Sequence, residues 1–443
     1  MKRKSIVLLA LIGVIILAVG AFFVIKLARD TIFVYEEPPT PAPSETLPSG
    51  ADPAITANMD EIEAQVSQLR GLEIDTQISR QLMTRDELEQ VVIEQFFAEY
   101  DPEQGEHDAA VMNLFGLLPA DFDLYNFYLG MYSEQIAGYY DSKETAMYVI
   151  TESGFGGMER STYAHEFVHA LQDFHFDFEG KLGYTDDLCK LDSERCAALQ
   201  SLIEGDATLT QQLWFQEYGT QEDLRDLQEF ATTYQSPVFD SAPLALTEAL
   251  TFPYLYGATF IQTLYAQGGI TAVDAAFTSV QPLSSEQIMH PNTYPEDVPQ
   301  YPTLPNLEAA LGQGWTQIDT GNLGEYYVYL VLAKGYNPQF RLFDSLAQGA
   351  AEGWGGDTYS VLRNEQTGEL AGMVALNWDT SADAKEAFEA FSSYSNLRFG
   401  AKAGGYWAGE SFFSSLLQTS DNSFVWLISQ DLVTLEALQE AAR

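Results

Sequence analysis

The chain has 443 residues, and its 64 acidic and 21 basic side chains give a formal net charge of −43 at pH 7. A hydrophobic content of 46% and an aromatic content of 13% favour a folded protein with a large core over a disordered one. So negative a surface repels nucleic acid and anionic membranes. This argues against nucleic-acid binding and is typical of a protein kept soluble outside the cell.

The first thirty residues differ from the rest of the chain. Basic residues at positions 2–4 precede an uncharged run over 5–25, which is long enough to cross the hydrocarbon core of a bilayer. Because positive flanks stay in the cytoplasm, this pattern predicts a single transmembrane helix at the cell membrane, with a cytoplasmic N-terminus and the remaining chain outside. The alternative is a cleaved signal peptide with Ala18 and Gly20 near the cleavage site, but the run is longer than a typical signal core.

Composition and periodicity divide the chain into four parts. Residues 1–30 form the cytoplasmic tip and anchor, and residues 31–57, which are rich in proline, form an extended linker. Residues 58–350 show mostly helical periodicity and form the main domain, whereas residues 351–443 form a small α+β domain. Within the main domain, Thr84 and Glu87 match a capping box and predict the start of a helix.

Aromatic and β-branched residues interrupt the helical pattern at 138–151. They flank a turn-like stretch at 141–144 and predict a β-hairpin whose second strand covers 146–150. This strand directly precedes the segment with the most informative motif, so we expect it to border the same site. An ordinary structural hairpin is the alternative.

The segment 161–178 carries an HExxH motif formed by His165, Glu166 and His169. Residues four apart lie on one face of a helix, so the two imidazoles can bind one metal ion with Glu166 beside it. The neighbouring residues are largely apolar and include neither Pro nor Gly, as expected of a helix buried beside a metal. Zinc is the expected ion, because imidazoles and a carboxylate form a borderline site. The alternative is a core helix with two structural histidines.

A catalytic zinc ion needs a third protein ligand and one open position. Glu204 is the first candidate, because apolar residues at helical spacing over 191–215 predict a second long helix that can pack beside the first. His175 is the second candidate, at the spacing of the metzincin pattern HExxHxxGxxH. That pattern needs Gly where the chain turns, and this chain has Gln172, a good helix former, at that position. A helix that continues to His175 carries its ring away, so Glu204 is preferred.

An HExxH motif followed by a glutamate on a later helix resembles the gluzincin group of zinc metallopeptidases. Glu204 stands in the sequence EGDA, which is similar to the EGxA around the third ligand in some aminopeptidase branches of that group. The resemblance implies Glu166 as general base, a strand at the edge of the cleft that pairs with a peptide substrate, and a histidine or tyrosine that stabilises the oxyanion. His290 is the candidate for that last role. Thr208 stands where the thermolysin form has aspartate, which leaves Asp206 and Asp173 as candidates for the residue that supports a ligand.

Cys189 and Cys196, the two cysteines, lie between the two metal-ligand helices, and their spacing permits a disulfide outside the cell. Pro253 and Gly257 predict a kink or break in a helical segment. From residue 353 the patterns follow the order ββαββα, which predicts helices packed on one sheet.

Together these features predict an α+β chain with an N-terminal transmembrane helix, a mainly helical zincin-like domain with a small edge hairpin, and a ββαββα C-terminal module. The expected function is that of a membrane-anchored, extracytoplasmic zinc metallopeptidase acting on a peptide or protein substrate. The alternative is a cell-surface binding or adhesion protein that keeps the scaffold without catalysis. The presence of Glu166 favours catalysis, because a binding protein has little need of a base at that position.

Overall fold

The computed structural model describes residues 53–97, 100–151 and 154–443, and within them the chain is α+β. The predicted fold class is wrong in including a transmembrane helix: among the described residues no helix is both long enough and apolar enough to cross a membrane. The apolar run over 5–25 that led to this prediction lies outside the described residues, as does most of the predicted linker.

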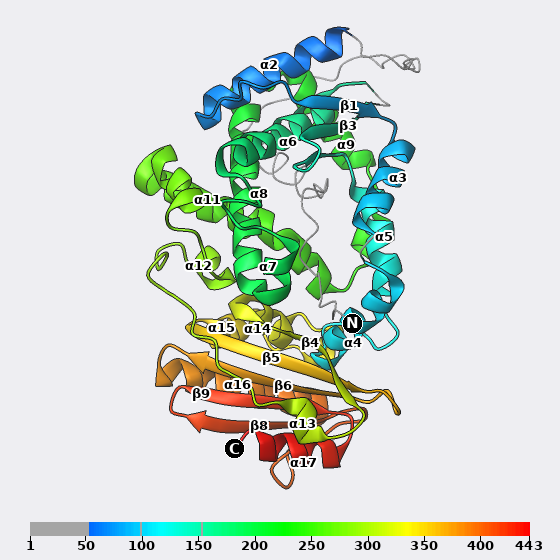
Figure 1. The fold of residues 1–443 in the computed structure, drawn as a ribbon, viewed down its shortest axis with the longest axis vertical. Coiled ribbons are helices and arrows are strands. Elements are labelled where there is room, and N and C mark those ends of the chain that lie inside the picture. The colour runs from blue at the N-terminus through cyan, green and yellow to red at the C-terminus, as the bar shows by residue number, and fades with distance from the viewer. Residues whose placement is uncertain (1–52, 98–99, 152–153) are drawn as a thin grey trace.

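Helices dominate the part of the chain before residue 290, which occupies the upper half of Figure 1. They are α2 (Pro53–Arg70), α3 (Arg85–Phe96), α4 (Pro102–Leu114), α5 (Leu124–Gln135), α6 (Gly157–Phe176), α7 (Asp186–Leu191), α8 (Ser193–Tyr218), α9 (Gln221–Thr233), α10 (Pro237–Asp240), α11 (Leu244–Thr278) and α12 (Ser285–Met289). Helix α3 begins with the predicted capping box, because Thr84 accepts a hydrogen bond from the backbone N–H of Glu87 and the Glu87 side chain accepts one from Thr84. The HExxH motif lies on α6, and Glu204 lies on α8.

A three-stranded sheet lies beside α6, with the strand order β1 (Ser79–Met83), β3 (Ala146–Ile150) and β2 (Gly138–Asp141). Strands β2 and β3 form the hairpin, whereas β1 pairs with β3 in parallel. Both edges of β3 are therefore paired, so this strand has no free edge for a substrate backbone, and the expectation that 146–150 pairs with a substrate is wrong. The strand next to the HExxH helix is β2, whose Tyr140 backbone N–H donates a hydrogen bond to Glu166.

Helices α8 and α11 cross at unusually close range through a pair of glycines. A Cβ atom on Gly205 would lie 2.2 Å from the backbone carbonyl carbon of Gly257, and one on Gly257 would lie 2.2 Å from the Ser201 carbonyl oxygen. Gly205 thus lets α8 approach α11 closely. The chain also stays helical through Pro253 and Gly257; the break in α11 lies at Gly269, whose φ of 65° favours glycine.

We expect Gly205→Ala to lower the free energy of unfolding by at least about 1–3 kcal/mol, because the added methyl group has only rigid backbone to displace. Gly130→Ala in α5 is a matched control, since its Cβ would make an ordinary contact of 3.5 Å with Val238. The control variant is expected to gain up to about 1 kcal/mol, because alanine is favoured over glycine inside helices. Chemical unfolding of both variants measures the difference, and equal stabilities would contradict the close crossing.

The C-terminal part is built on a six-stranded sheet in the lower half of Figure 1. Its strand order is β4-β5-β6-β9-β8-β7, and each neighbouring pair is antiparallel. The elements are α13 (Leu307–Leu311), β4 (Trp315–Gly321), α14 (Gly324–Ala333), η1 (Pro338–Phe340), α15 (Asp344–Ala351), β5 (Trp354–Asn364), β6 (Leu370–Trp378), α16 (Ser381–Phe399), β7 (Trp407–Ala408), β8 (Phe413–Ser420), β9 (Ser423–Ser429) and α17 (Leu432–Ala441). The sheet is larger than predicted, because β4 joins it from before residue 351 and β7 adds a short edge.

Alternating side chains of β9 cover both faces of this sheet. Trp426 lies in the main core with Phe391 of α16, whereas Leu427 lies in a separate small core with Leu435 of α17. The main core is continuous with the helical part: Phe115, after α4, packs against Trp426 with ring centroids 5.9 Å apart. The sheet and the helices that carry the HExxH motif therefore share one core.

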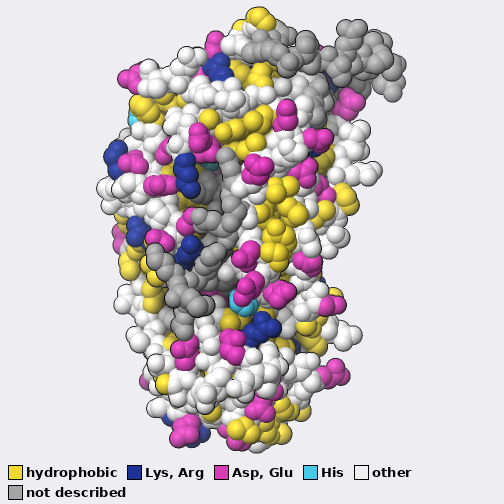
Figure 2. Space-filling model, turned by 45° about the vertical axis from the view of Figure 1, so that its right-hand side comes forward, with side chains coloured by type: hydrophobic (Ala, Val, Ile, Leu, Met, Phe, Trp, Pro, Cys, Tyr) yellow, Lys and Arg dark blue, Asp and Glu magenta, His cyan; other side chains and the backbone are white. Residues whose placement is uncertain are grey.

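Acidic and basic side chains are intermingled on the face of the molecule that Figure 2 shows. Figure 2 shows acidic side chains scattered over one face of the molecule, with basic side chains interspersed among them. Such a distribution fits the net charge of −43. It favours solubility, because the electrostatic field of the acidic side chains is not concentrated in one region of this face.

Candidate metal centre

His165, His169 and Glu204 meet in the interior between α6 and α8. Each is at most 2% exposed, and each offers a ligand atom within 4.8 Å of the other two. The Glu204 Oε2 atom lies 3.2 Å from His165 Nε2 and 3.5 Å from His169 Nε2. The structure thus brings together the two histidines of the motif and the preferred third candidate, although the residues are up to 39 positions apart in the sequence.

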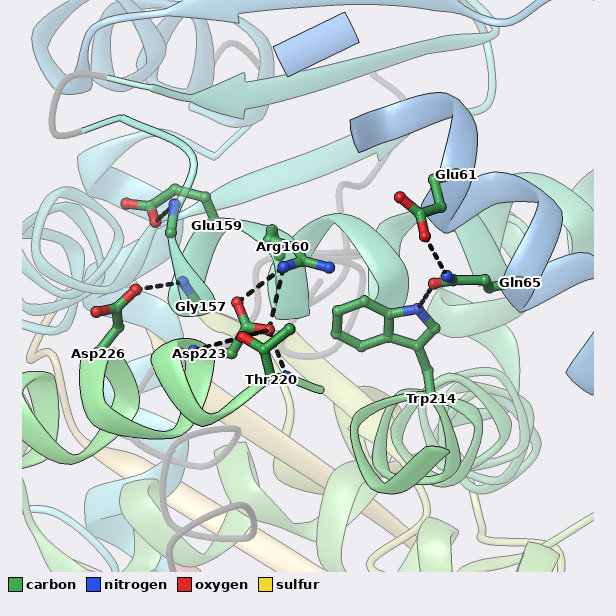
Figure 3. A network of polar contacts seen from close by, with 10 residues as sticks. Glu61, Gln65, Gly157, Glu159, Arg160, Trp214, Thr220, Asp223 and Asp226 are labelled. Atoms are coloured by element: carbon green, nitrogen blue, oxygen red, sulfur yellow. Dashed lines mark hydrogen bonds and ion pairs between the residues drawn. The ribbon is translucent and has the colours of Figure 1, made fainter. Parts of the chain in front are cut away.

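The amino end of α6 is anchored by α9, which sets the position of the HExxH residues. Figure 3 shows this network: the Gly157 N–H donates to Asp226 at 2.9 Å, and the Arg160 Nη1 atom lies 3.1 Å from both carboxylate oxygens of Asp223. Glu159 accepts a hydrogen bond from the Gly156 N–H. Acceptors at a helix start satisfy its free N–H groups and interact favourably with its dipole.

Two glutamine side chains orient the imidazoles. His165 Nδ1 lies 3.3 Å from Gln211 Oε1, and His169 Nδ1 lies 3.0 Å from Gln172 Oε1. Each amide orientation is set by its own donated hydrogen bonds, from Gln211 to Ser161 and from Gln172 to the Ile203 carbonyl. An amide oxygen only accepts, so both Nδ1 atoms carry the proton. With Nδ1 protonated, the Nε2 atom on the side of Glu204 is the one that each ring can offer to a metal once it has lost its proton.

The two candidates for the residue that supports a ligand have different positions. Asp206 accepts a hydrogen bond from Gln172 at 2.9 Å and one from Arg70 Nε at 2.9 Å, so it acts on His169 through the glutamine. Asp173 instead accepts a hydrogen bond from the Tyr140 hydroxyl at 3.0 Å. Asp206 therefore supports His169 through Gln172. Asp173 instead supports Tyr140, whose backbone N–H donates a hydrogen bond to Glu166.

Glu166 is fully buried beside the cluster. Its Oε2 atom accepts the hydrogen bond from the Tyr140 N–H at 3.0 Å, whereas Oε1 is buried with no hydrogen-bond partner among the described residues. Burial raises the pKa of Glu166 to about 8, and the nearby Glu204 adds to that effect. A carboxylate with so high a proton affinity is suited to act as a base near neutral pH.

The residues present fit a metal ion. His169 Nε2 and Glu204 Oε1 are buried without a hydrogen-bond partner in the described structure, an arrangement that costs free energy unless a ligand satisfies them. Burial acts to raise the pKa of Glu204, but the two imidazoles outweigh it and lower that pKa to about 2. Burial lowers the pKa of His165. Burial acts to lower the pKa of His169 as well, but Glu204 outweighs it and raises that pKa to about 9, so the His169 ring holds a proton beside the carboxylate. A zinc ion would take the place of this proton, because zinc binds ionised carboxylates and deprotonated imidazole nitrogens.

Tyr254 on α11 was not predicted from the sequence. Its ring centroid lies 6.4 Å from that of His165, and its hydroxyl is hydrogen-bonded to Glu204. Burial, together with the Glu204 charge, raises the pKa of Tyr254 well above 10, so the hydroxyl stays a neutral donor. Tyr254 lies three residues before Gly257, and the close crossing of α8 and α11 brings it to the cluster. In the sequence, nothing indicates that Gly205 and Gly257 face each other, so the position of Tyr254 beside Glu204 could be explained only after the helix crossing was known.

Two predicted candidates lie elsewhere. His290, at the end of α12, has its Nε2 atom 2.8 Å from Glu325 Oε1, and its contacts in the described structure include none of the cluster residues. Its suggested oxyanion role is therefore not supported by this geometry. His175 has its Nε2 atom 2.9 Å from the Glu73 carbonyl oxygen, at the far end of α6. The helix does continue past Gln172, for the reason expected, and its Asp177 cap comes only after His175.

A disulfide joins Cys189 and Cys196 and clamps the junction between α7 and α8. The bridge lies two turns before Glu204 on the helix that carries it, so it restrains the start of that helix.

Comparison with known proteins covers only the C-terminal part of the chain. Residues 313–438 match the model of a family described as a domain of unknown function (DUF8575). The match runs from β4 into α17 and includes none of the cluster residues. No curated protein and no solved structure matches the chain.

Proposed function

We propose that this chain is an extracytoplasmic zinc metallopeptidase of gluzincin type that hydrolyses peptide bonds. The observation that carries the proposal is the meeting of His165, His169 and Glu204 beside the buried Glu166, where His169 Nε2 and Glu204 Oε1 have no hydrogen-bond partner among the described residues. The disulfide between Cys189 and Cys196 supports an oxidising compartment, because such bridges are rare in a reducing cytosol.

The described residues have distinct parts in this chemistry. His165 and His169 would hold zinc through Nε2 and Glu204 through its carboxylate, and the ion would supply Lewis acidity. Glu166 takes a proton from the attacking water, while the Tyr140 N–H holds its other oxygen in place. Tyr254 keeps its hydroxyl proton, which it donates to Glu204; by turning from Glu204 to the oxygen that becomes negative in the transition state, the same hydroxyl would stabilise that charge.

Metal analysis combined with a broad peptide-library cleavage screen tests this proposal. We expect about one zinc ion per chain, cleavage that stops on treatment with a zinc chelator, and recovery when zinc is restored. Purified chain that holds no zinc would contradict the metal centre. Chain that holds zinc yet cleaves no peptide would contradict catalysis and favour the binding-protein alternative.

A further inference from the structure

A second cluster of carboxylates joins the helical part to the C-terminal sheet. Glu286 comes from α12, Asp297 from the segment that follows it, and Asp379 from the residue directly after β6. Each offers an oxygen atom within 4.8 Å of the others. Glu286 is 2% exposed, Asp297 is half-buried and Asp379 is exposed, so the cluster is closed on one side and open to solvent on the other.

The described part of the chain supplies no positive partner for this cluster. Glu286 Oε2 is buried without a hydrogen-bond partner, and within the described part of the chain no lysine or arginine forms an ion pair with any of the three carboxylates. The nearby His290 is bonded to another carboxylate, Glu325. A buried carboxylate oxygen without a partner in the described structure indicates a missing positive partner.

The three ligand-bearing segments are held in place by hydrogen bonds outside the cluster. Gln287 Nε2 donates to the backbone carbonyl of Asp297. Gln300, in the segment that carries Asp297, is hydrogen-bonded to two strands of the sheet. Its backbone N–H donates to the Gly355 carbonyl of β5 at 2.7 Å, and its backbone carbonyl accepts from Asn377 Nδ2 of β6 at 3.1 Å. The carboxylates therefore stand together on a backbone that other contacts already fix, as a preorganised site requires.

We propose that Glu286, Asp297 and Asp379 bind a calcium ion that links α12 and the segment after it to the C-terminal sheet. The donors are oxygen atoms alone, with neither histidine nor cysteine, which suits a hard cation and not zinc. Calcium accepts six to eight oxygen ligands in flexible geometry, and the exposed side at Asp379 leaves room for water to complete the shell. This site is separate from the HExxH cluster and does not depend on the proposed peptidase activity.

Thermal unfolding of the zinc-loaded, full-length chain, stripped of calcium and titrated with calcium chloride, tests the proposal. We expect the midpoint to rise and saturate, because calcium binds the folded chain and not the unfolded one. Glu286→Gln and Asp379→Asn are expected to lower calcium affinity at least about tenfold, since each removes a charged ligand. Without calcium, Glu286→Gln is expected to be no less stable than the wild type, which separates lost binding from failed folding.

Glu365→Gln is the matched control, because Glu365 is an exposed acid in the turn between β5 and β6, at the opposite end of β6 from Asp379. This variant should keep the full calcium response. A wild type whose midpoint does not respond to calcium would overturn the site. So would an equal response in all variants, which would show general screening of the negative surface. A magnesium response as large as that of calcium would overturn the assignment to calcium.

Discussion

Glu166→Gln is expected to lower kcat/KM for peptide hydrolysis by about 10²–10⁴-fold while zinc content stays at the wild-type level. Glutamine has the same shape, and its amide oxygen can still accept the hydrogen bond that Tyr140 donates to Glu166. The side chain therefore keeps its place but loses the ability to take a proton. Because Glu166 is not among the three grouped ligand residues, the metal should remain bound.

The matched control for this variant is Glu179→Gln, an exposed glutamate just after the same helix. It removes the same charge without touching the buried cluster, so its activity and zinc content should equal those of the wild type. Steady-state kinetics and metal analysis of both variants are needed. Substantial activity in Glu166→Gln would show that another group acts as the base, and loss of zinc in that variant would place Glu166 among the ligands.

Glu204→Ala should weaken zinc binding more than about 100-fold, beyond the 10–100-fold typical of residues that only support a ligand. The reason is that Glu204 supplies the only negative charge of the three ligands, within 3.5 Å of both Nε2 atoms. Glu204→Gln keeps the volume of the side chain and removes only the charge, so it should also bind zinc weakly. Competition titration with a chromophoric chelator measures these affinities.

His175→Ala is the comparison that distinguishes the two candidate third ligands. Its imidazole contacts the Glu73 carbonyl, so its loss should change zinc affinity little. A strong loss of zinc in His175→Ala together with normal binding in Glu204→Ala would overturn the gluzincin-type assignment and favour a metzincin-like site.

Local patterns determined the parts of the site that lie within one helix. The spacing of His165 and His169 places both rings on one face of any α-helix, and the absence of a helix-breaking residue at Gln172 carries the helix past His175. Apolar periodicity also placed Glu204 on a long helix, and the spacing of the cysteines allowed the disulfide. These inferences depend on contacts between residues close in sequence, for which periodicity and side-chain chemistry are sufficient.

Only the tertiary structure decided which elements meet. Tyr254 reaches Glu204 because Gly205 and Gly257 let two helices cross at close range, and neither glycine specifies its partner in the sequence. Strand β3 proved central because β1, more than sixty residues earlier, pairs with it. The carboxylates of Glu286 and Asp379 likewise come together only when the segment after α12 is hydrogen-bonded to β5 and β6 through Gln300. Many helices and strands have the same local sequence pattern, so the pattern does not say which of them will pack together. These contacts are decided by how the elements pack into one core, and they could not be read from the order of residues alone.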